Sequence, residues 1–235
     1  MKEALILAGG FGTRLSHIIS DLPKPMAPIN GTPFLSFLLN KLIAARIEHV
    51  VLSTGYLHES IFSYFGSSYK GLQISYSKED VPLFTGGAIA LGAHKIESDS
   101  FLVLNGDTFF DIDFEVFAKF HTSKQTLLSI ALRQVEDTSR FGSVIIDEQH
   151  KIINFTEKGN AVKAGLINGG IYIIDKTIFK KISLPEKFSF EKELLETWYH
   201  RFDFFGYPCC NYFIDIGIPE DYARAQYELP AFLES

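Results

Sequence analysis

The sequence has few of the features that mark secreted or membrane proteins. Among its 235 residues are only two cysteines, Cys209 and Cys210, and because they are adjacent they are poorly placed for an ordinary disulfide. The longest apolar runs fall far short of the roughly 20 residues that a membrane-spanning helix needs. The chain reaches Gly9 and Gly10 too early for the apolar core of a signal peptide. We therefore expect a soluble, cytoplasmic protein.

Positive charge is also scarce. The sequence has 22 Lys and Arg against 28 Asp and Glu, a net charge of −6, and no block of consecutive basic residues. General binding to nucleic acid or to an anionic membrane usually needs a basic surface, so we expect neither partner. With 46% apolar and 21% charged residues the composition is that of a globular protein, and the length favours one large domain.

Strands and helices are predicted to alternate in the first half of the chain. Short apolar runs indicate strands, and apolar residues at helical spacing indicate helices. The expected strands are Ala4–Ala8, His49–Ser53, Gln73–Ser77 and Phe101–Asn105; the expected helices are 33–43 (with Thr32 as N-cap), Leu57–Phe65 and Thr85–Ala93. Such alternation predicts a mostly parallel sheet with helices on both faces.

After about residue 125 the pattern changes to strands separated by turns. Strands are expected at Leu127–Arg133, Ser143–Asp147, Lys151–Thr156, Leu166–Ile174 and Tyr212–Asp215, and helices at Phe190–Tyr199 and Pro219–Tyr227. There is no internal repeat and no linker rich in proline or serine. We therefore expect the second half to extend the same sheet, so that residues 1–235 form a single α/β domain.

A glycine-rich loop, GGFGTRL at residues 9–15, follows the first strand. It matches neither the P-loop nor the dinucleotide-binding fingerprint. It carries Arg14, and Lys24 follows between Pro23 and Pro25. These cations are either ordinary solvated side chains or part of a triphosphate site. In the second case amides of the loop would meet the phosphates, Arg14 would hold a pyrophosphate, and Lys24 would supply a compact charge.

This loop and the following Pro-Lys-Pro resemble the signature of the sugar-1-phosphate nucleotidylyltransferases, also called nucleoside-diphosphate-sugar pyrophosphorylases. The resemblance extends over nearly the whole chain. It implies a Rossmann-like three-layer α/β/α sandwich with a mostly parallel mixed sheet, in which about 1–125 bind the nucleotide and about 126–235 the sugar. The segments 22–28, 105–111, 166–170, 188–191 and 212–222 resemble more narrowly the branch that joins GTP to a heptose 1-phosphate.

Two aspartates are candidate metal ligands. Asp107 and Asp215 each follow an apolar predicted strand, and Mg²⁺ prefers carboxylate oxygens together with phosphates and water. Aspartates also cap turns after strands, but the resemblance implies that these two bind the metal. Asp111 and Asp113 form a D-x-D pattern like that of metal-dependent glycosyltransferases. We interpret them as helix-start residues, and no histidine spacing suggests zinc.

Glu79 is the residue on which we base the choice of nucleotide. Guanine offers two adjacent donors that suit a carboxylate, whereas uracil and thymine suit glutamine better. A family position resembling Glu79 often contacts the base, which favours GTP over a solvent-exposed role. The family usually has glycine where this chain has Phe84, so the path of that loop is open. The expected nucleotide-binding residues are Leu7, Ala8, Gly9, Gly10, Gly12, Thr13, Arg14, Lys24, Glu79, Pro82, Thr85, Gly86, Gly87, Asn105, Gly106 and Asp107.

The second half carries the candidate sugar-binding residues. Glu157 and Lys158 resemble the family's Glu-Lys pair, in which Glu accepts from sugar hydroxyls and Lys binds the sugar phosphate. Asn168 and Gly169 resemble a segment that approaches the sugar, and Gly142 resembles a glycine of close approach. A strand-end ion pair and glycine bulges are the structural alternatives. Ser189 and Glu191 border this region without an assigned role.

The expected reaction is an in-line displacement in which a sugar 1-phosphate oxygen attacks the α-phosphorus of GTP and pyrophosphate leaves. Arg14 and Lys24 are the candidate catalytic residues and Mg²⁺ the expected cofactor. The alternatives are a mannose-1-phosphate guanylyltransferase, a uridylyl- or thymidylyltransferase, a metal-dependent glycosyltransferase, and a non-catalytic nucleotide sensor. The sequence leaves the oligomeric state open, including a homo-oligomer.

Overall fold

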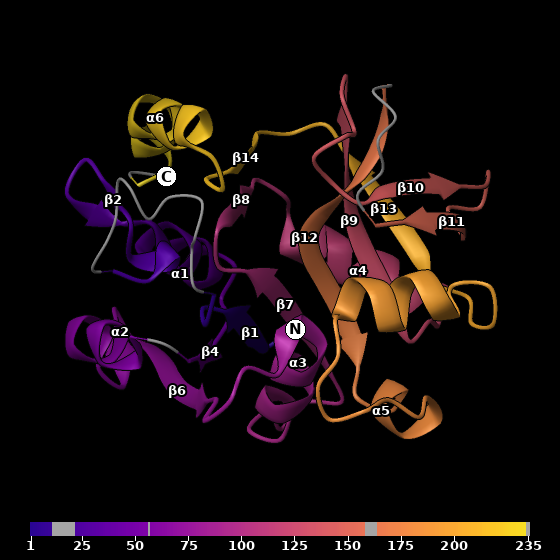
Figure 1. Ribbon diagram of the computed structural model, residues 1–235, viewed down its shortest axis with the longest axis horizontal. Helices are drawn as coiled ribbons and strands as arrows, with labels where there is room; N and C mark the ends of the chain where they lie inside the picture. Colours follow the sequence, from indigo (N-terminus) through magenta and orange to yellow (C-terminus); the bar gives the residue numbers. More distant parts are fainter. Residues whose placement is uncertain (11–21, 56, 158–163, 234–235) are drawn as a thin grey trace.

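The apolar strand at the start of the chain lies in the interior of a large mixed sheet. The computed structural model describes residues 1–10, 22–55, 57–157 and 164–233, and its main sheet has ten strands in this part of the chain (Figure 1). Strand β1 pairs in parallel with its neighbours on both sides. The first-half strands are β1 (Glu3–Leu7), β4 (His49–Thr54), β5 (Ser68–Tyr69), β6 (Leu72–Lys78) and β7 (Ser100–Asn105).

The second half extends the same sheet through antiparallel strands. Strand β12 (Gly165–Asp175) pairs antiparallel with β7 along its C-terminal part, and also with β9 and β10. The remaining strands are β9 (Leu128–Val135), β10 (Ser143–Ile146), β11 (Ile152–Thr156) and β13 (Phe205–Cys209). The mixed sheet is confirmed, with its parallel strands mainly in the first half and antiparallel pairing dominating the second.

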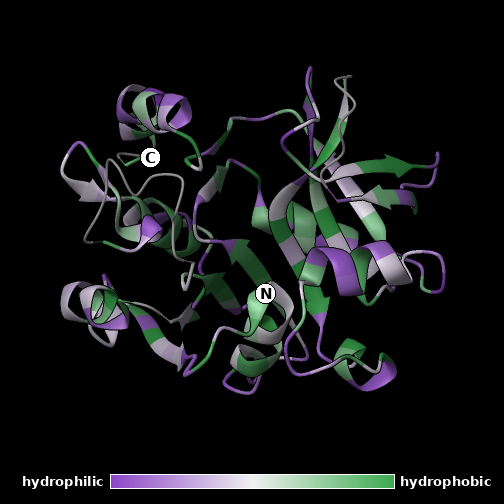
Figure 2. Cartoon of the chain, in the orientation of Figure 1, coloured by the Kyte–Doolittle hydropathy of each residue, from purple (hydrophilic) through white to green (hydrophobic). Residues whose placement is uncertain are grey.

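Helices cover both faces of this sheet, because successive residues of its central strands are buried on opposite faces. Ala4 and Ile6 of β1 belong to one apolar core and Leu5 to the other. The first core includes helices α1 (Phe34–Ala44), α2 (His58–Phe65), α4 (Phe114–Lys124) and α6 (Pro219–Glu228); the second includes α3 (Phe84–Ala93), α5 (Ile178–Lys181) and the π-helical η3 (Phe190–Glu196). Figure 2 shows the apolar residues concentrated along the sheet. Within the described residues, no helix is both long and apolar enough to span a membrane.

Short elements differ most from the sequence-based expectations. Helix α1 begins at Phe34 and not at Pro33, because Thr32–Pro33 forms β3, which pairs with β2 (Pro28–Ile29). Strand β13 was not predicted, since Pro208 disfavours a strand. The structure accommodates this proline because, among the described residues, β13 forms a ladder only with β9, apart from an isolated bridge between Phe205 and Lys151. The short ladder between β8 (Thr108–Phe110) and β14 (Phe213–Asp215) also places two distant segments side by side.

Candidate functional site

Two adjoining cavities lie at the carboxyl ends of the parallel strands, where α/β sheets usually bind ligands. The larger, of 340 Å³, is lined by Leu7, Gly9, Gly10, Glu79, Pro82, Phe84, Thr85, Ala88, Ser189 and Glu191. The smaller, of 190 Å³, is lined by Leu7, Gly10, Lys24, Pro25, Thr85, Asn105, Gly106 and Asp107. They share Leu7, Gly10 and Thr85, so together they form one groove. We call them the large and the small cavity.

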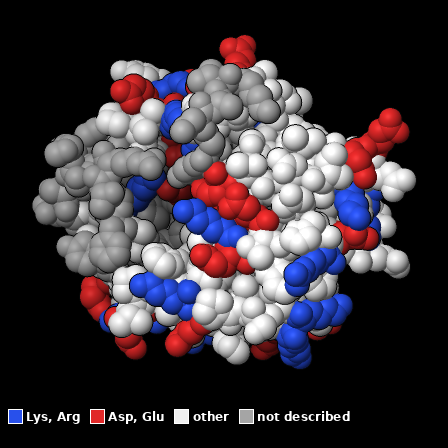
Figure 3. Space-filling model, turned by 45° about the vertical axis from the view of Figure 1, so that its right-hand side comes forward, with Lys and Arg blue, Asp and Glu red and all other residues white. Residues whose placement is uncertain are grey.

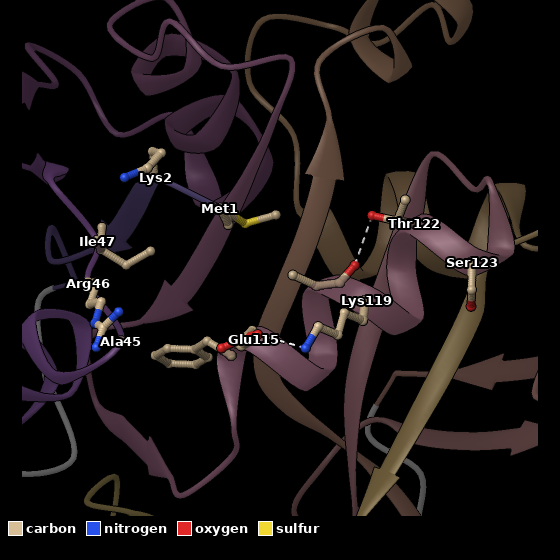
Figure 4. A pocket seen from close by; sticks show the side chains of 11 residues that line it. Met1, Lys2, Ala45, Arg46, Ile47, Glu115, Lys119, Thr122 and Ser123 are labelled. Atoms are coloured by element: carbon tan, nitrogen blue, oxygen red, sulfur yellow. Dashed lines mark hydrogen bonds and ion pairs between the residues drawn. The ribbon is translucent and has the colours of Figure 1, made fainter.

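A still larger hollow, of 640 Å³, lies at the opposite edge of the sheet (Figure 4). Its lining includes Met1 and Lys2, which precede β1, and Arg46, which precedes β4. Figure 4 shows Glu115 and Lys119 paired with each other on α4, at 2.6 Å and largely exposed to solvent. Since ligands of open α/β sheets bind at the carboxyl ends of the strands, the groove there is the candidate functional site.

Lys24 lies at the small cavity with its charge directed at a carboxylate. It begins the 3-10 turn η2 (Lys24–Met26), which follows the extended Pro23. Its side chain is 15% exposed, and its Nζ lies 2.5 Å from Oδ2 of Asp107. The flanking prolines limit the backbone and hold this lysine at the groove.

Asp107 and Asp215, which we call the acidic pair, are brought together by the β8–β14 ladder. Asp215 is paired with Thr108 across the ladder, and the carbonyl of Asp107 accepts a hydrogen bond of 3.0 Å from the Ile216 amide. The Gly217 amide donates to Oδ1 of Asp215 at 2.6 Å. A Cβ at Gly217 would lie 2.5 Å from this oxygen and 3.1 Å from Lys24 Nζ, so only glycine fits between these groups.

The electrostatics of the acidic pair favour a cation. Burial, and then the nearby charge of Asp107, raise the pKa of Asp215 to about 6, against the opposing effects of Lys24 and the Gly217 amide. The described residues contain no group of three or more His, Cys, Asp or Glu side chains that would hold a metal alone. Two carboxylates nevertheless fit Mg²⁺, which commonly takes one or two from the protein and the rest from phosphates and water.

Glu79 is held in the wall of the large cavity. It follows β6, where its amide donates to the Thr54 carbonyl at 2.8 Å. Its Oε2 accepts a hydrogen bond of 2.8 Å from the Leu83 amide, and Oε1 one of 3.4 Å from the Ser53 hydroxyl. Burial raises the pKa of this carboxyl group. A Cβ at Gly9 would lie 3.2 Å from Oε1, so the glycine-rich loop begins directly against Glu79.

The N-terminus of α3 is bonded to the second half of the chain. The Thr85 hydroxyl donates to Oε2 of Glu191 at 2.7 Å and accepts from the Phe190 amide at 2.9 Å. The Ser189 hydroxyl donates to the same Glu191 oxygen at 2.9 Å. Ser189 and Glu191 thus line the large cavity, and not a separate sugar pocket as expected. The segment FSFE at 188–191 was the available signal for them, but its position beside Thr85 depends on tertiary packing.

Three predicted nucleotide-binding residues are not among those that line the two cavities. The amides of Gly86 and Gly87 both donate to the Phe188 carbonyl, at 2.9 and 3.2 Å. A Cβ at Gly86 would lie 2.1 Å from the Phe188 ring, and one at Gly87 would lie 2.5 Å from the Glu186 carbonyl oxygen. These glycines therefore allow α3 to pack closely and do not line either cavity. Ala8 is fully buried, outside both cavities.

The predicted sugar-binding residues lie close to one another at β10, β11 and β12. The Asn168 amide donates to the Gly142 carbonyl at 2.8 Å, and a Cβ at Gly142 would lie 3.1 Å from Oε2 of Glu157. The side chain of Asn168 donates to the Tyr172 hydroxyl at 2.8 Å. A Cβ at Gly169 would lie 2.7 Å from the Phe110 ring, so the absence of a side chain there allows close packing.

Asn105, a predicted nucleotide-binding residue, lies beside the segment that carries the predicted sugar-binding residues Asn168 and Gly169. It lines the small cavity, and a Cβ at Gly170 would lie only 2.8 Å from its Nδ2. Gly170 has φ +71°, a conformation that favours glycine. Oδ1 of Asn105 is buried and has no hydrogen-bond partner among the described residues, so this acceptor can receive a ligand donor. Asn105 and Gly170 therefore bring the end of β7 and strand β12 together beside the small cavity.

The D-x-D aspartates are engaged elsewhere. Oδ1 of Asp113 accepts from the Glu115 and Val116 amides, at 2.8 and 3.0 Å, and so caps α4 as predicted. Oδ1 of Asp111 pairs with Lys41 Nζ at 2.6 Å. Of the other predicted site residues, Gly12, Thr13, Arg14 and Lys158 lie outside the described residues. Figure 3 shows acidic and basic side chains gathered toward the middle of one face.

Known proteins resemble this chain over nearly its whole length. The model of the family described as Nucleotidyl transferase matches residues 3–231. The chain is 46% identical to D-glycero-alpha-D-manno-heptose 1-phosphate guanylyltransferase of Aneurinibacillus thermoaerophilus, over 98% of this chain and 100% of the relative. It is 48% identical to the protein of the same name from Campylobacter jejuni, over 94% and 96%. Mannose-1-phosphate guanylyltransferase of Mycobacterium tuberculosis is 37% identical, over 97% of this chain and 64% of the relative.

Solved structures show the same fold. HddC from Yersinia pseudotuberculosis complexed with GMP-PN superposes with a TM-score of 0.85 at 36% identity, over 97% of this chain and 100% of that one. A putative glucose-1-phosphate thymidylyltransferase from Bacillus anthracis gives a TM-score of 0.86 at 26% identity, over 96% and 94%. The resemblance found in the sequence and the fold predicted from it are both confirmed.

Proposed function

This chain belongs to the nucleotidyl transferase family, and from that premise we propose that it joins GTP to D-glycero-α-D-manno-heptose 1-phosphate, giving GDP-heptose and pyrophosphate. Two heptose 1-phosphate guanylyltransferases that match it over nearly their full lengths support the substrate pair. The observation that carries the reaction is the groove in which Lys24 and the acidic pair adjoin a cavity containing Glu79.

We assign the two substrates to the two parts of the sheet. Residues of about 1–125 supply Lys24 and the lining of the large cavity apart from Ser189 and Glu191, and so would bind the nucleotide. Residues of about 126–235 supply Gly142, Glu157 and Asn168, which would bind the sugar, with Lys158 on its phosphate. The meeting of Asn105 with Gly170 supports an arrangement in which both substrates approach the small cavity.

The proposed chemistry is a direct displacement at phosphorus. An oxygen of the sugar 1-phosphate forms a bond to the α-phosphorus of GTP, the bond from that phosphorus to the oxygen bridging to the β-phosphorus breaks, and pyrophosphate leaves. A phosphate monoester is already mostly ionised near pH 7, so no general base is needed. The protein's task is to align two anions that repel each other and to stabilise the charge that develops.

Lys24 is the residue of the described chain that we assign to charge stabilisation at the α-phosphate. Its ammonium lies at the small cavity and is already paired with Asp107. Arg14 would hold the departing pyrophosphate. We propose Mg²⁺ as the cofactor, held by Asp107 and Asp215, where it would neutralise phosphate charge when bound.

Glu79 is proposed to select guanine, because a carboxylate can accept from both N1–H and the 2-amino group. Its Oε2 already accepts from the Leu83 amide, which holds the carboxylate in one orientation while its other lone pairs remain available. The two adjacent cysteines, both unpaired, fit a reducing cytoplasm, which is the location we propose.

A screen of four NTPs against several sugar 1-phosphates, followed by pyrophosphate release, tests this proposal. We expect the highest kcat/KM for GTP with the heptose 1-phosphate. Greater activity with mannose 1-phosphate would favour the alternative suggested by the 37% identical relative. Preference for UTP or dTTP, or release of no pyrophosphate with any pair, would contradict the proposal.

A further inference from the structure

Phe84 has a backbone conformation that its side chain disfavours. Its φ is +61°, in the left-handed region where a bulky residue is strained. The neighbouring bonds hold the chain on this path: Glu79 accepts from the Leu83 amide, and the Leu83 carbonyl accepts from the Phe188 amide at 3.1 Å. A glycine would adopt the same path without strain, so the phenylalanine needs a compensating role.

Packing within the protein does not provide that compensation. Phe84 is 58% exposed, although it is a large apolar residue. The ammonium of Lys187 lies 4.6 Å from the centroid of its ring, a cation–π contact that is worth little at an exposed position. Most of the apolar area of the ring therefore remains available for a ligand to cover.

The ring lies where the base of a nucleotide would bind. Phe84 lines the large cavity together with Glu79 and Pro82. Glu79 provides a hydrogen-bonding edge in this cavity, and the Phe84 ring with Pro82 provides apolar wall. Flat aromatic bases gain from contact with both kinds of surface: stacking acts on any base, whereas hydrogen bonds distinguish one base from another.

We propose that Phe84 is a specificity residue whose ring packs against the purine of the nucleotide. This inference rests on the proposed function, in which the large cavity holds the base of GTP. A purine presents a larger flat surface than a pyrimidine, so Phe84 favours GTP and ATP over UTP and dTTP, and Glu79 adds the preference for guanine over the other bases. The strained backbone keeps the ring at the rim of the cavity.

The substitution Phe84→Gly removes the ring and the backbone strain together. Thermal stability then reports on the strain, and nucleotide binding reports on the ring. We expect this variant to melt at the same or a higher temperature, because the left-handed conformation no longer opposes a side chain. In calorimetric titrations without sugar phosphate, its Kd for GTP should rise about five- to 150-fold, the range expected for one lost stacking contact. The Kd for UTP should change less, and Phe84→Trp should restore GTP binding.

Gln125→Gly is the matched control. Gln125 also has a positive φ, of 49°, but it is exposed at the end of α4 and lines neither cavity. It should gain stability without any change in nucleotide binding. If Phe84→Gly binds GTP as tightly as the wild type, or if GTP and UTP weaken equally, the inference is overturned. Because binding is measured directly, a wild type that binds GTP but transfers it to no sugar phosphate refutes the proposed function and leaves this test intact.

Discussion

Lys24 and the acidic pair show how single residues define the site. Lys24 is nearly buried and lies at contact distance from Asp107, while the charge of Asp107 opposes ionisation of Asp215. Among the described residues, the charges of Lys24 and, to a smaller extent, Arg140 counter this effect. Additional positive charge would favour the ionised form of both carboxylates. The phosphates of the substrates would supply negative charge that balances it.

Replacing Lys24 with alanine should lower kcat/KM by at least about 100-fold, the size typical of losing one preorganised charge contact in a transition state. Steady-state pyrophosphate release measures this effect. Lys41→Ala is the control, because Lys41 is equally shielded and pairs with Asp111 at 2.6 Å outside the groove. Wild-type activity in Lys24→Ala would exclude this lysine from the reaction.

Glu79→Gln should weaken discrimination for GTP over UTP and dTTP. Glutamine keeps the size of the side chain but replaces one acceptor oxygen with a donor, which mismatches the two donors of guanine. The measurement is the ratio of kcat/KM values for the three nucleotides. An unchanged ratio would mean that other residues choose the base.

At the scale of elements, helix α3 owes its position to glycine. Gly86 and Gly87 bring its first turn against 186–188, and Gly92 brings its last turn against Leu5 of β1, where a Cβ would lie 2.3 Å from a methyl carbon. This close packing holds Thr85 and Phe84 at the groove. The β8–β14 ladder acts similarly on the acidic pair, since it joins residues far apart in the chain.

Gly87→Ala should lower the free energy of unfolding by about 1–3 kcal/mol, the usual cost of overpacking, because the new methyl group meets the Glu186 carbonyl. Denaturant unfolding measures this loss. Gly10→Ala is the contrasting variant: no atom of the described residues lies within 4 Å of a Cβ there, so its stability should remain unchanged although it lines both cavities. Equal stability of the two variants would contradict the packing role of Gly87.

At the scale of the whole molecule, the site depends on joining the two halves of the chain. Strand β12 pairs with β7 of the first half and with β9 and β10 of the second, so a single sheet carries residues for both substrates. In the acidic pair, Asp107 comes from the first half of the chain and Asp215 from the second. The raised pKa of Asp215 therefore depends on both halves being folded together.

The raised pKa of Asp215 predicts a dependence of stability on pH and on metal. Between its ordinary value near 4 and its folded value of about 6, the folded protein binds the additional proton. Without metal, the contribution of Asp215 to stability therefore falls as pH rises through this window. Mg²⁺ should favour the ionised carboxylate, so it should raise Tm more at pH 7.5 than at pH 5.

Asp215→Asn tests whether Asp215 causes this dependence of stability on pH and on Mg²⁺. Without metal the variant should be more stable than the wild type at pH 7.5, and Mg²⁺ should shift its Tm much less. Thermal unfolding at the two pH values, with and without Mg²⁺, provides the measurement. Equal shifts in the wild type at both pH values, or an equal shift in the variant, would refute the role of Asp215.

The sequence by itself determined the family, the main strands and helices other than β13, and most of the residues that line the groove around Glu79 and Lys24. These follow from local patterns: apolar runs, glycine-rich turns and charged residues at strand ends. Only the tertiary structure decided that Gly86, Gly87 and Gly169 serve packing, that Glu191 joins Thr85, and that Phe84 accepts a left-handed backbone. Each of these depends on a neighbour distant in the chain, and such contacts form only when the sheet brings both segments together.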